Sequence, residues 1–200
     1  MNIPIRQIRA LYDQETIRVY QAYNDAIADS ALENRSFISP PFKLDRMTWI
    51  KPSFLWMMYR SGWSEKDSGQ KRILAIDITR KGFEWALANS ALTDHPRTDK
   101  NPEETREIRA TKPVRIQWDP ERDLHLNRLE HKSIQIGLGK EAVQLYLNEW
   151  IQAISDVTKL AKEVNNLVQE SRESEAQLLL PPETPYSISS TLSTHLGMTT

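Results

Sequence analysis

The side chains best suited to chemistry gather in residues 42–63. These twenty-two positions hold six aromatic residues and four basic residues, with Asp45 as the single acid. A helix built only for burial would not carry Arg46, Lys51 and Arg60 among its rings, and a helix in water would not carry the rings. The mixture therefore predicts one wall of a ligand pocket that is apolar, rigid and positively charged.

Three amides lie inside stretches that otherwise have the pattern of strands, namely Gln21, Gln117 and Gln135. Tyr23 stands two residues after the first of them. An amide can orient a ligand because it both donates and accepts hydrogen bonds. It can equally lie on the solvent face of a half-exposed strand, so both interpretations stay open.

A charged corner follows the strand pattern that contains Gln117. It consists of Asp119, Glu121, Arg122 and Asp123. One interpretation is a contact between Arg122 and an anionic ligand, with Asp119 or Glu121 as a base. The other interpretation is a solvated turn whose charges pair with one another.

Composition excludes several kinds of site. The chain has no cysteine, which excludes disulfides, thiolate metal sites and cysteine nucleophiles. It has no glycine-rich phosphate loop, and its four histidines lack the spacing of a metal site. We therefore expect no metal, and the sequence alone names no catalytic residue.

Charge and hydropathy limit the partners and the cellular compartment that can be expected for this protein. A net charge of −1 argues against a general nucleic-acid coat. No run approaches the ~20 apolar residues of a membrane span, and the N-terminus lacks the apolar core of a signal peptide. These features predict a cytoplasmic protein without a membrane partner.

Strand and helix patterns alternate along the chain. Strands are predicted over residues 17–23, 72–79, 114–118 and 133–138, the third ending before Asp119 and Pro120. Helices are predicted from Asn24 or Asp25 to residue 32, over residues 52–61, and after residue 79 as far as Ala91. Because the residue pairs of tight hairpins are missing, we expect an α+β fold with a small mixed sheet and flanking helices.

A long C-terminal helix is predicted over residues 140–170. Apolar residues recur there at heptad spacing, at Val143, Leu147, Trp150, Ile154, Val157, Ala161, Val164 and Val168. The helix would be about 45 Å long, more than a small domain needs. Its first half is expected to pack on the sheet. Its second half either packs there too or contacts a second copy in a weak homodimer.

The chain is expected to form one domain over residues 1–170, followed by a tail. Eleven of the last thirty residues are Ser or Thr, and three prolines interrupt any regular pattern. Such a segment buries little apolar surface, so residues 171–200 are predicted to be disordered. Residues 93–112 are polar and predict a long surface loop, either a lid or a mobile connection.

Four stretches resemble the family labelled domain of unknown function 4291. They are VYQAYN at residues 19–24, RMTWIKPSFLWMMYRSGW at 46–63, QWDPER at 117–122 and SIQIGL at 133–138. The resemblance covers roughly residues 5–155. The resemblance implies that the chain is a member of this family and points to these four stretches as its characteristic positions. It implies no activity.

A second resemblance is to the fold of the ADP-ribosyltransferases. There a first strand leads into a helix, as residues 17–37 could do, and later strands close a nicotinamide-binding cleft. This resemblance implies NAD as a cofactor. The chain departs from it at Gln21 and Tyr23, where His or Arg followed by Gly is usual. It departs again at Gln135, where a catalytic Glu that stabilises the oxocarbenium-like transition state is usual.

Together these patterns predict a ligand cleft. Its expected residues are Gln21, Tyr23, Arg46, Trp49, Lys51, Arg60, Gln117, Arg122 and Gln135. The positive wall favours a phosphate-bearing small molecule or nucleotide, with or without a transferase activity of the ADP-ribosyltransferase kind. The alternative is a non-enzymatic module for single-stranded nucleic acid, in which Trp49, Trp56 and Trp63 stack on bases. A concave pocket would favour the first hypothesis, and rings exposed along an open groove would favour the second.

Overall fold

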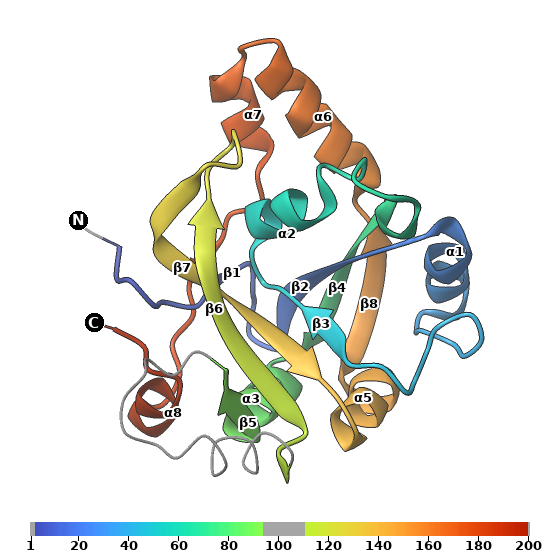
Figure 1. The fold of residues 1–200 in the computed structure, drawn as a ribbon, viewed down its shortest axis with the longest axis vertical. Helices are drawn as coiled ribbons and strands as arrows, with labels where there is room; N and C mark the ends of the chain where they lie inside the picture. Colours follow the sequence, from blue (N-terminus) through green and yellow to red (C-terminus); the bar gives the residue numbers. More distant parts are fainter. Residues whose placement is uncertain (1–2, 94–110, 200) are drawn as a thin grey trace.

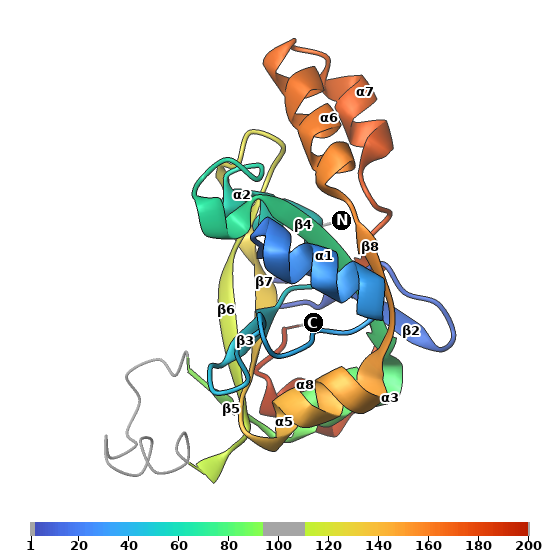
Figure 2. The same ribbon diagram turned by 90° about the vertical axis from the view of Figure 1, so that its right-hand side faces the viewer.

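Residues 3–93 and 111–199 are described by a computed structural model of the chain (Figure 1 and Figure 2). The first sheet is antiparallel and contains, in spatial order, β2 (Thr16–Tyr23), β4 (Arg72–Thr79) and β8 (Ile151–Asp156). The second contains, in spatial order, β3 (Thr48–Ile50), β7 (Arg128–Leu138), β6 (Val114–Arg122) and β5 (Ser90–Leu92). It is mixed, because β5 and β6 run parallel while β3, β7 and β6 are antiparallel. The predicted α+β class is confirmed.

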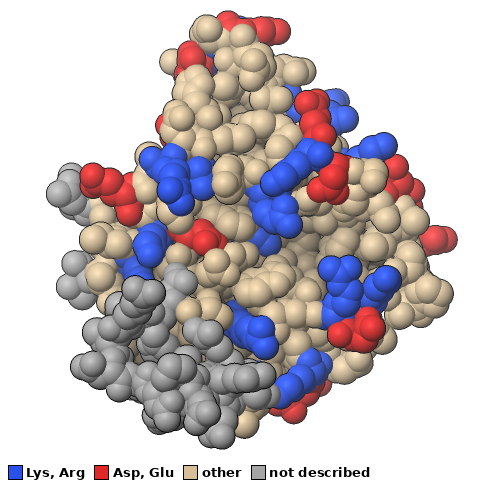
Figure 3. All heavy atoms as spheres, viewed as in Figure 1, with Lys and Arg blue, Asp and Glu red and all other residues tan. Residues whose placement is uncertain are grey.

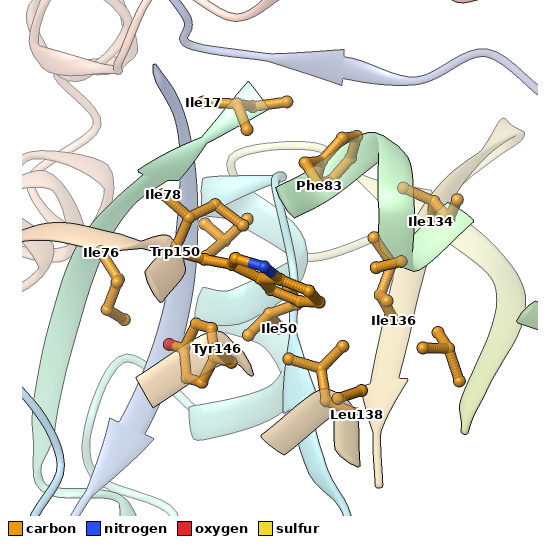
Figure 4. Close-up of a cluster of buried hydrophobic side chains, with 14 of the residues drawn as sticks. Ile17, Ile50, Ile76, Ile78, Phe83, Ile134, Ile136, Leu138, Tyr146 and Trp150 are labelled. Carbon is orange, nitrogen blue, oxygen red and sulfur yellow. The ribbon is translucent and has the colours of Figure 1, made fainter. Parts of the chain in front are cut away.

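The two sheets pack against each other around the main core. Ile76 and Ile78 of β4 enter it from one sheet, and Ile134 and Ile136 of β7 enter it from the other. Figure 4 shows these side chains on either side of Trp150. The opposite face of β4 is covered by a second buried cluster. This strand is therefore apolar on both faces, which explains its continuous apolar pattern.

The three helices predicted in the first half are present, and the second begins at Phe54 instead of the predicted residue 52. They are α1 (Asp25–Asn34), α2 (Phe54–Ser61) and α3 (Arg80–Ala88). Asn24 and Ser53 cap α1 and α2 with side-chain oxygens that accept backbone hydrogen bonds. Gly62 ends α2 in the left-handed conformation, with φ of 57°. Helix α3 ends before the predicted Ala91, because the next residues pair with β6 as β5.

The predicted end of the third strand before Asp119 and Pro120 is wrong. Strand β6 continues past Asp119 and Pro120, and it pairs antiparallel with β7 across a short connection. Pro120 lies opposite Lys132, and the register shifts between Pro120 and Arg122, where one residue of β6 faces residues 129–131 of β7. Asp123 closes the turn by accepting a hydrogen bond from Asn127 N at 2.8 Å. This longer turn carries none of the residue pairs that signal a two-residue hairpin.

The single helix predicted over residues 140–170 is also wrong. The segment contains α5 (Glu141–Leu145), the π-helical turn η2 (Tyr146–Trp150), strand β8 and α6 (Thr158–Gln169). Ile154 lies opposite Ile76 in the β4–β8 ladder, so its apolar character serves a strand. Pairing with β4 overrides the helical spacing of the sequence.

The tail predicted to be disordered is ordered over residues 171–199. It contains α7 (Glu173–Leu179), β9 (Thr184–Pro185) and α8 (Ser190–His195), and β9 pairs with β1 (Arg9–Ala10). Tyr186 is 2% exposed and Leu196 is buried. Figure 1 shows this segment returning past β1 to the lower end of the molecule. The prediction of disorder from composition was wrong because a few buried apolar residues anchor this segment, although it is rich in Ser and Thr.

The second half of the heptad pattern is covered by the chain itself. Ala161, Val164 and Val168 of α6 are buried in the second cluster together with Ala176 of α7. The two helices pack side by side at one end of the molecule (Figure 1 and Figure 2). These positions are therefore unavailable to the homodimer predicted from the sequence.

Residues 94–110, most of the predicted surface loop, lie outside the described residues. Within the described part of the chain, no helix is long and apolar enough to cross a membrane. The same residues contain no group of three or more His, Cys, Asp or Glu that could hold a metal ion.

Candidate functional site

A cleft of about 780 Å³ lies where the end of β2, the loop before β3, β3 itself and α2 meet. The 3₁₀ turn η1 (Ser68–Gln70) completes its rim. Figure 3 shows a hollow on this face of the molecule with Lys and Arg side chains on both sides of it. Seven residues predicted from the sequence line the cleft: Gln21, Tyr23, Arg46, Trp49, Lys51, Arg60 and Gln135.

One backbone contact brings the two sheets together at the cleft. Tyr20 N donates to Lys51 O at 2.7 Å, which joins β2 to the residue after β3. Strand β3 is anchored on its other side by the pairing of Trp49 with Gly137 of β7. Arg60 is presented by the last turn of α2. The cleft is thus framed by paired strands and a capped helix.

Gln21 and Tyr23 hold this junction together. The Gln21 amide donates to Thr48 Oγ1 at 2.6 Å and to Trp49 O at 3.1 Å, and its oxygen accepts from the Tyr146 hydroxyl at 2.8 Å. The Tyr23 hydroxyl also hydrogen-bonds Thr48 Oγ1, at 3.0 Å. Both N–H groups of the Gln21 amide are therefore engaged within the protein, so this residue positions β3 from inside the cleft wall.

Gln117 and Gln135 act together on one carboxylate. They face each other across β6 and β7, and both donate to Asp119, with Gln117 Nε2 at 3.1 Å from Asp119 Oδ1. Gln135 lines the cleft, whereas Gln117 lies outside its lining. The sequence predicted both amides as ligand-binding residues, and their shared partner is visible only once the register of the hairpin is known.

Arg122 does not line the cleft, contrary to the prediction. Its guanidinium stacks on Tyr59, 3.5 Å from the ring centroid, and Nη1 donates to Leu126 O at 3.2 Å. Glu121 next to it is a buried carboxyl whose pKa is raised by desolvation, against a hydrogen bond from Arg122 N. The charged corner therefore divides into Asp119 on the amide pair and Arg122 against α2.

The three tryptophans of the segment at residues 42–63 have different surroundings. Trp49 is half-buried in the cleft wall, and its indole lies over Gly137, where a Cβ would come within 2.9 Å of the ring. Trp56 and Trp63 are only 6% and 7% exposed. The stacking platform of three rings predicted for nucleic acid is therefore absent, because two of the rings are packed inside the molecule.

Lys51 is the most unusual charged residue of the cleft. It is 5% exposed, and its Nζ lies 5.1 Å from the centroid of the Trp56 ring. Burial, with a smaller contribution from the nearby charge of Arg60, lowers the pKa of Lys51 to about 7, and the charge of Asp119 partly opposes this shift. A cation in such a position is costly unless an anion joins it.

Four basic residues line the cleft: Lys43, Arg46, Lys51 and Arg60. Asp67 is the one carboxylate among the described lining residues. Within the described part of the chain, none of the four bases has a carboxylate within 4.0 Å. The lining therefore presents positive charge that these carboxylates do not neutralise.

Sequence reasoning missed three residues of the site. Thr48 accepts a hydrogen bond from Gln21 and shares another with the Tyr23 hydroxyl, whereas the sequence pattern selected only its neighbours Trp49 and Lys51. Lys43 also lines the cleft, and it could have been predicted because it is one of the four basic residues of the segment at residues 42–63. Asp67 comes from the turn before β4, and no pattern in the sequence marks it.

The chain was compared with known proteins. The family described as Domain of unknown function (DUF4291) matches residues 7–186, which include β1, both larger sheets and the β9 strand. No curated protein matches the chain. The match spans most of the sequence and every residue of the cleft, and on this basis the chain belongs to the DUF4291 family.

Proposed function

We propose that the cleft binds a phosphate-bearing small molecule of about the size of a nucleotide. The observation that carries this proposal is the convergence of four basic residues on one cleft without a described carboxylate in ion-pair range. A volume of about 780 Å³ lies within the usual range for small-molecule sites.

The chemistry of the lining supports an anion of this class. Arg46 and Arg60 carry planar guanidinium groups, which match phosphate oxygens in pairs. The half-buried indole of Trp49 offers a flat apolar surface for a base or another ring. A phosphate would also offset the cost of holding Lys51 and Arg60 near each other.

NAD is the finer form of this proposal, with transfer chemistry of the ADP-ribosyltransferase kind. Such a reaction requires negative charge near the developing oxocarbenium ion. Gln135 occupies the position where the resemblance leads one to expect Glu, and Asp119 is hydrogen-bonded to this Gln135. Asp119 does not line the cleft, so in the NAD form of the proposal we assign it a role through Gln135, to which its negative charge is hydrogen-bonded.

The alternative, a module for single-stranded nucleic acid, has less support. Successive bases need successive rings along an open groove. Trp56 and Trp63 are buried, which leaves Trp49 as the one tryptophan of that segment in the cleft. A mononucleotide needs one such ring, and an oligonucleotide needs several.

Calorimetric titration with ADP-ribose, NAD, ATP and a short oligonucleotide tests the proposal. Arg46→Ala and Arg60→Ala should each weaken nucleotide binding about 10- to 100-fold, because a hydrogen bond to a charged group contributes about 1.5–3 kcal/mol. The control is Arg128→Ala, an exposed arginine at the start of β7, which should bind normally. Equal losses in all three variants, or preference for the oligonucleotide, would overturn the proposal.

A further inference from the structure

The position of Lys51 is fixed by its backbone and its side chain. Its carbonyl oxygen accepts from Tyr20 N, so the residue cannot shift without breaking the junction of the two sheets. Its side chain lies against the Trp56 ring and lines the cleft while remaining 5% exposed. The amine is therefore held at a defined place in the wall of the cleft.

The surroundings of Lys51 favour a neutral amine. No described carboxylate lies within ion-pair distance of its Nζ, and Arg60 is a nearby positive charge. With a pKa lowered to about 7 by burial, about half of the amine carries no proton at pH 7, against about one in three thousand for an ordinary lysine. Only the neutral form has the lone pair that attacks an electrophile.

We infer that the Lys51 amine forms an imine with the carbonyl group of a phosphorylated aldehyde or ketone held in this cleft, an inference that rests on the proposed function. Nζ attacks the carbonyl carbon, and a C–N bond forms while the C=O π electrons move to oxygen, which takes a proton. Nitrogen then loses a proton, the hydroxyl leaves as water with one added proton, and the C=N bond closes. No oxidant, reductant or metal is needed.

The other bases of the cleft provide the selectivity for phosphate. Arg46, Arg60 and Lys43 line the same cleft and are not required as nucleophiles. A phosphate held by these groups would keep the carbonyl of the same molecule near Lys51 and raise its effective concentration there. A carbonyl compound without phosphate has no such anchor. The cleft should therefore distinguish the two by affinity before any bond forms.

Reductive trapping tests the inference on the full chain. The protein is incubated at pH 7 with pyridoxal 5′-phosphate, reduced with sodium borohydride and mapped by peptide mass spectrometry. We expect at least about tenfold more label on Lys51 than on any other lysine, because its neutral fraction is larger. Pyridoxal without phosphate should label Lys51 at least about tenfold less, and pyrophosphate should compete with the label.

Two variants and a non-covalent probe separate this inference from the proposed function. Lys51→Arg keeps a positive charge and should lose the label while still binding pyridoxine 5′-phosphate, which has no carbonyl. Lys162→Arg, on the exposed face of α6, should label normally. If pyridoxine 5′-phosphate binds but Lys51 of the natural chain stays unlabelled, the imine is wrong and the phosphate cleft stands. If neither phosphate compound binds, both proposals fail.

Discussion

Lys51 is the buried base of the cleft lining, whereas Lys43, Arg46 and Arg60 are exposed. Burial disfavours its protonated form, Arg60 adds to this effect, and Asp119 opposes it from β6. A cation–π contact with the Trp56 ring, 5.1 Å from Nζ, offsets part of the free energy that the amine loses when it leaves water. Without a ligand, the protonated amine should therefore destabilise the fold.

This balance predicts the effect of Lys51→Met on stability. The pKa of Lys51 is about 7 in the folded chain and about 10.4 in the unfolded chain, so the unfolded state binds more protons between these values. Stability from this group therefore rises with pH from about 7 to 10.4. Lys51→Met should raise the melting temperature at pH 6 and lose this advantage by pH 10. Lys162→Met, on exposed α6, is the control, and parallel curves for the natural chain and Lys51→Met would contradict the assignment.

Single residues of the cleft were partly predictable from sequence. The segment at residues 42–63 carries its own signal, because charges among rings need no knowledge of distant contacts. Arg122 was misplaced for a different reason. It follows a register shift between Pro120 and Arg122, which strand alternation cannot reveal. Gln117 lies before this shift, and its hydrogen bond to Asp119 is visible only in the structure.

At the scale of elements, local signals succeeded where the chain defines its own ends. Strands β2 and β4 follow their apolar patterns, and α2 ends at Gly62 as predicted, although Ser53 caps its start, one residue after the predicted Pro52. The prediction for the residues of β8 was wrong because this strand forms only by pairing with β4, which lies far away in the sequence. Spacing of apolar residues alone does not distinguish a helix from a helix followed by a strand.

Helix α2 depends on a carboxyl from the C-terminal segment. Phe54 N donates to Glu183 Oε1 at 2.6 Å, so this residue satisfies a free N–H of the first turn of α2. Burial, with a contribution from Glu121 of β6, raises the pKa of Glu183 to about 8 against the opposing hydrogen bond from Phe54 N. Arg9 of β1 lowers the pKa, and the Tyr20 ring is a further titratable neighbour.

The sign of this shift predicts a loss of stability as the pH rises from about 4.5 to about 8. Glu183 binds a proton more tightly in the folded chain, so its contribution is present below about pH 4.5 and is lost as the pH rises to about 8. Glu183→Gln keeps an acceptor for Phe54 N and removes this titration. Its melting temperature should exceed that of the natural chain at pH 8.5 and approach it at pH 4.5. Glu163→Gln on α6 should match the natural chain at both, and a Glu183→Gln deficit at pH 8.5 would show that the charged form is required.

At the scale of the whole molecule, the two ends of the chain close the fold together. Strand β9 pairs with β1, and Trp118 Nε1 of β6 donates to Leu196 O at 3.0 Å. The C-terminal segment therefore contacts β6 of the second sheet. Through Glu183 it also supports α2, the helix that presents Arg60. Composition could not predict this, since it averages over thirty residues while the contacts depend on a few.

Tyr186 is the residue that tests this closure most directly. Its hydroxyl donates to Glu84 at 2.7 Å and accepts from Arg80 Nε at 2.9 Å, and its ring packs edge-on against Tyr12 and Phe83. Removing a buried aromatic side chain costs about 3–5 kcal/mol, because packing is lost and a cavity remains. Tyr186→Ala should therefore lower the free energy of unfolding by about this amount in urea titration.

A matched substitution in the same segment shows whether the stability lost in Tyr186→Ala comes from undocking of the C-terminal segment. Leu178 lies in α7 and is 85% exposed, so Leu178→Ala should change the free energy of unfolding by less than about 0.5 kcal/mol. A two-state transition in Tyr186→Ala with a lower midpoint and an unchanged slope would mean that the segment unfolds with the sheets as one unit. Equal stability of both variants would mean instead that the C-terminal segment is detached in solution, and that the support of α2 by Glu183 is absent with it.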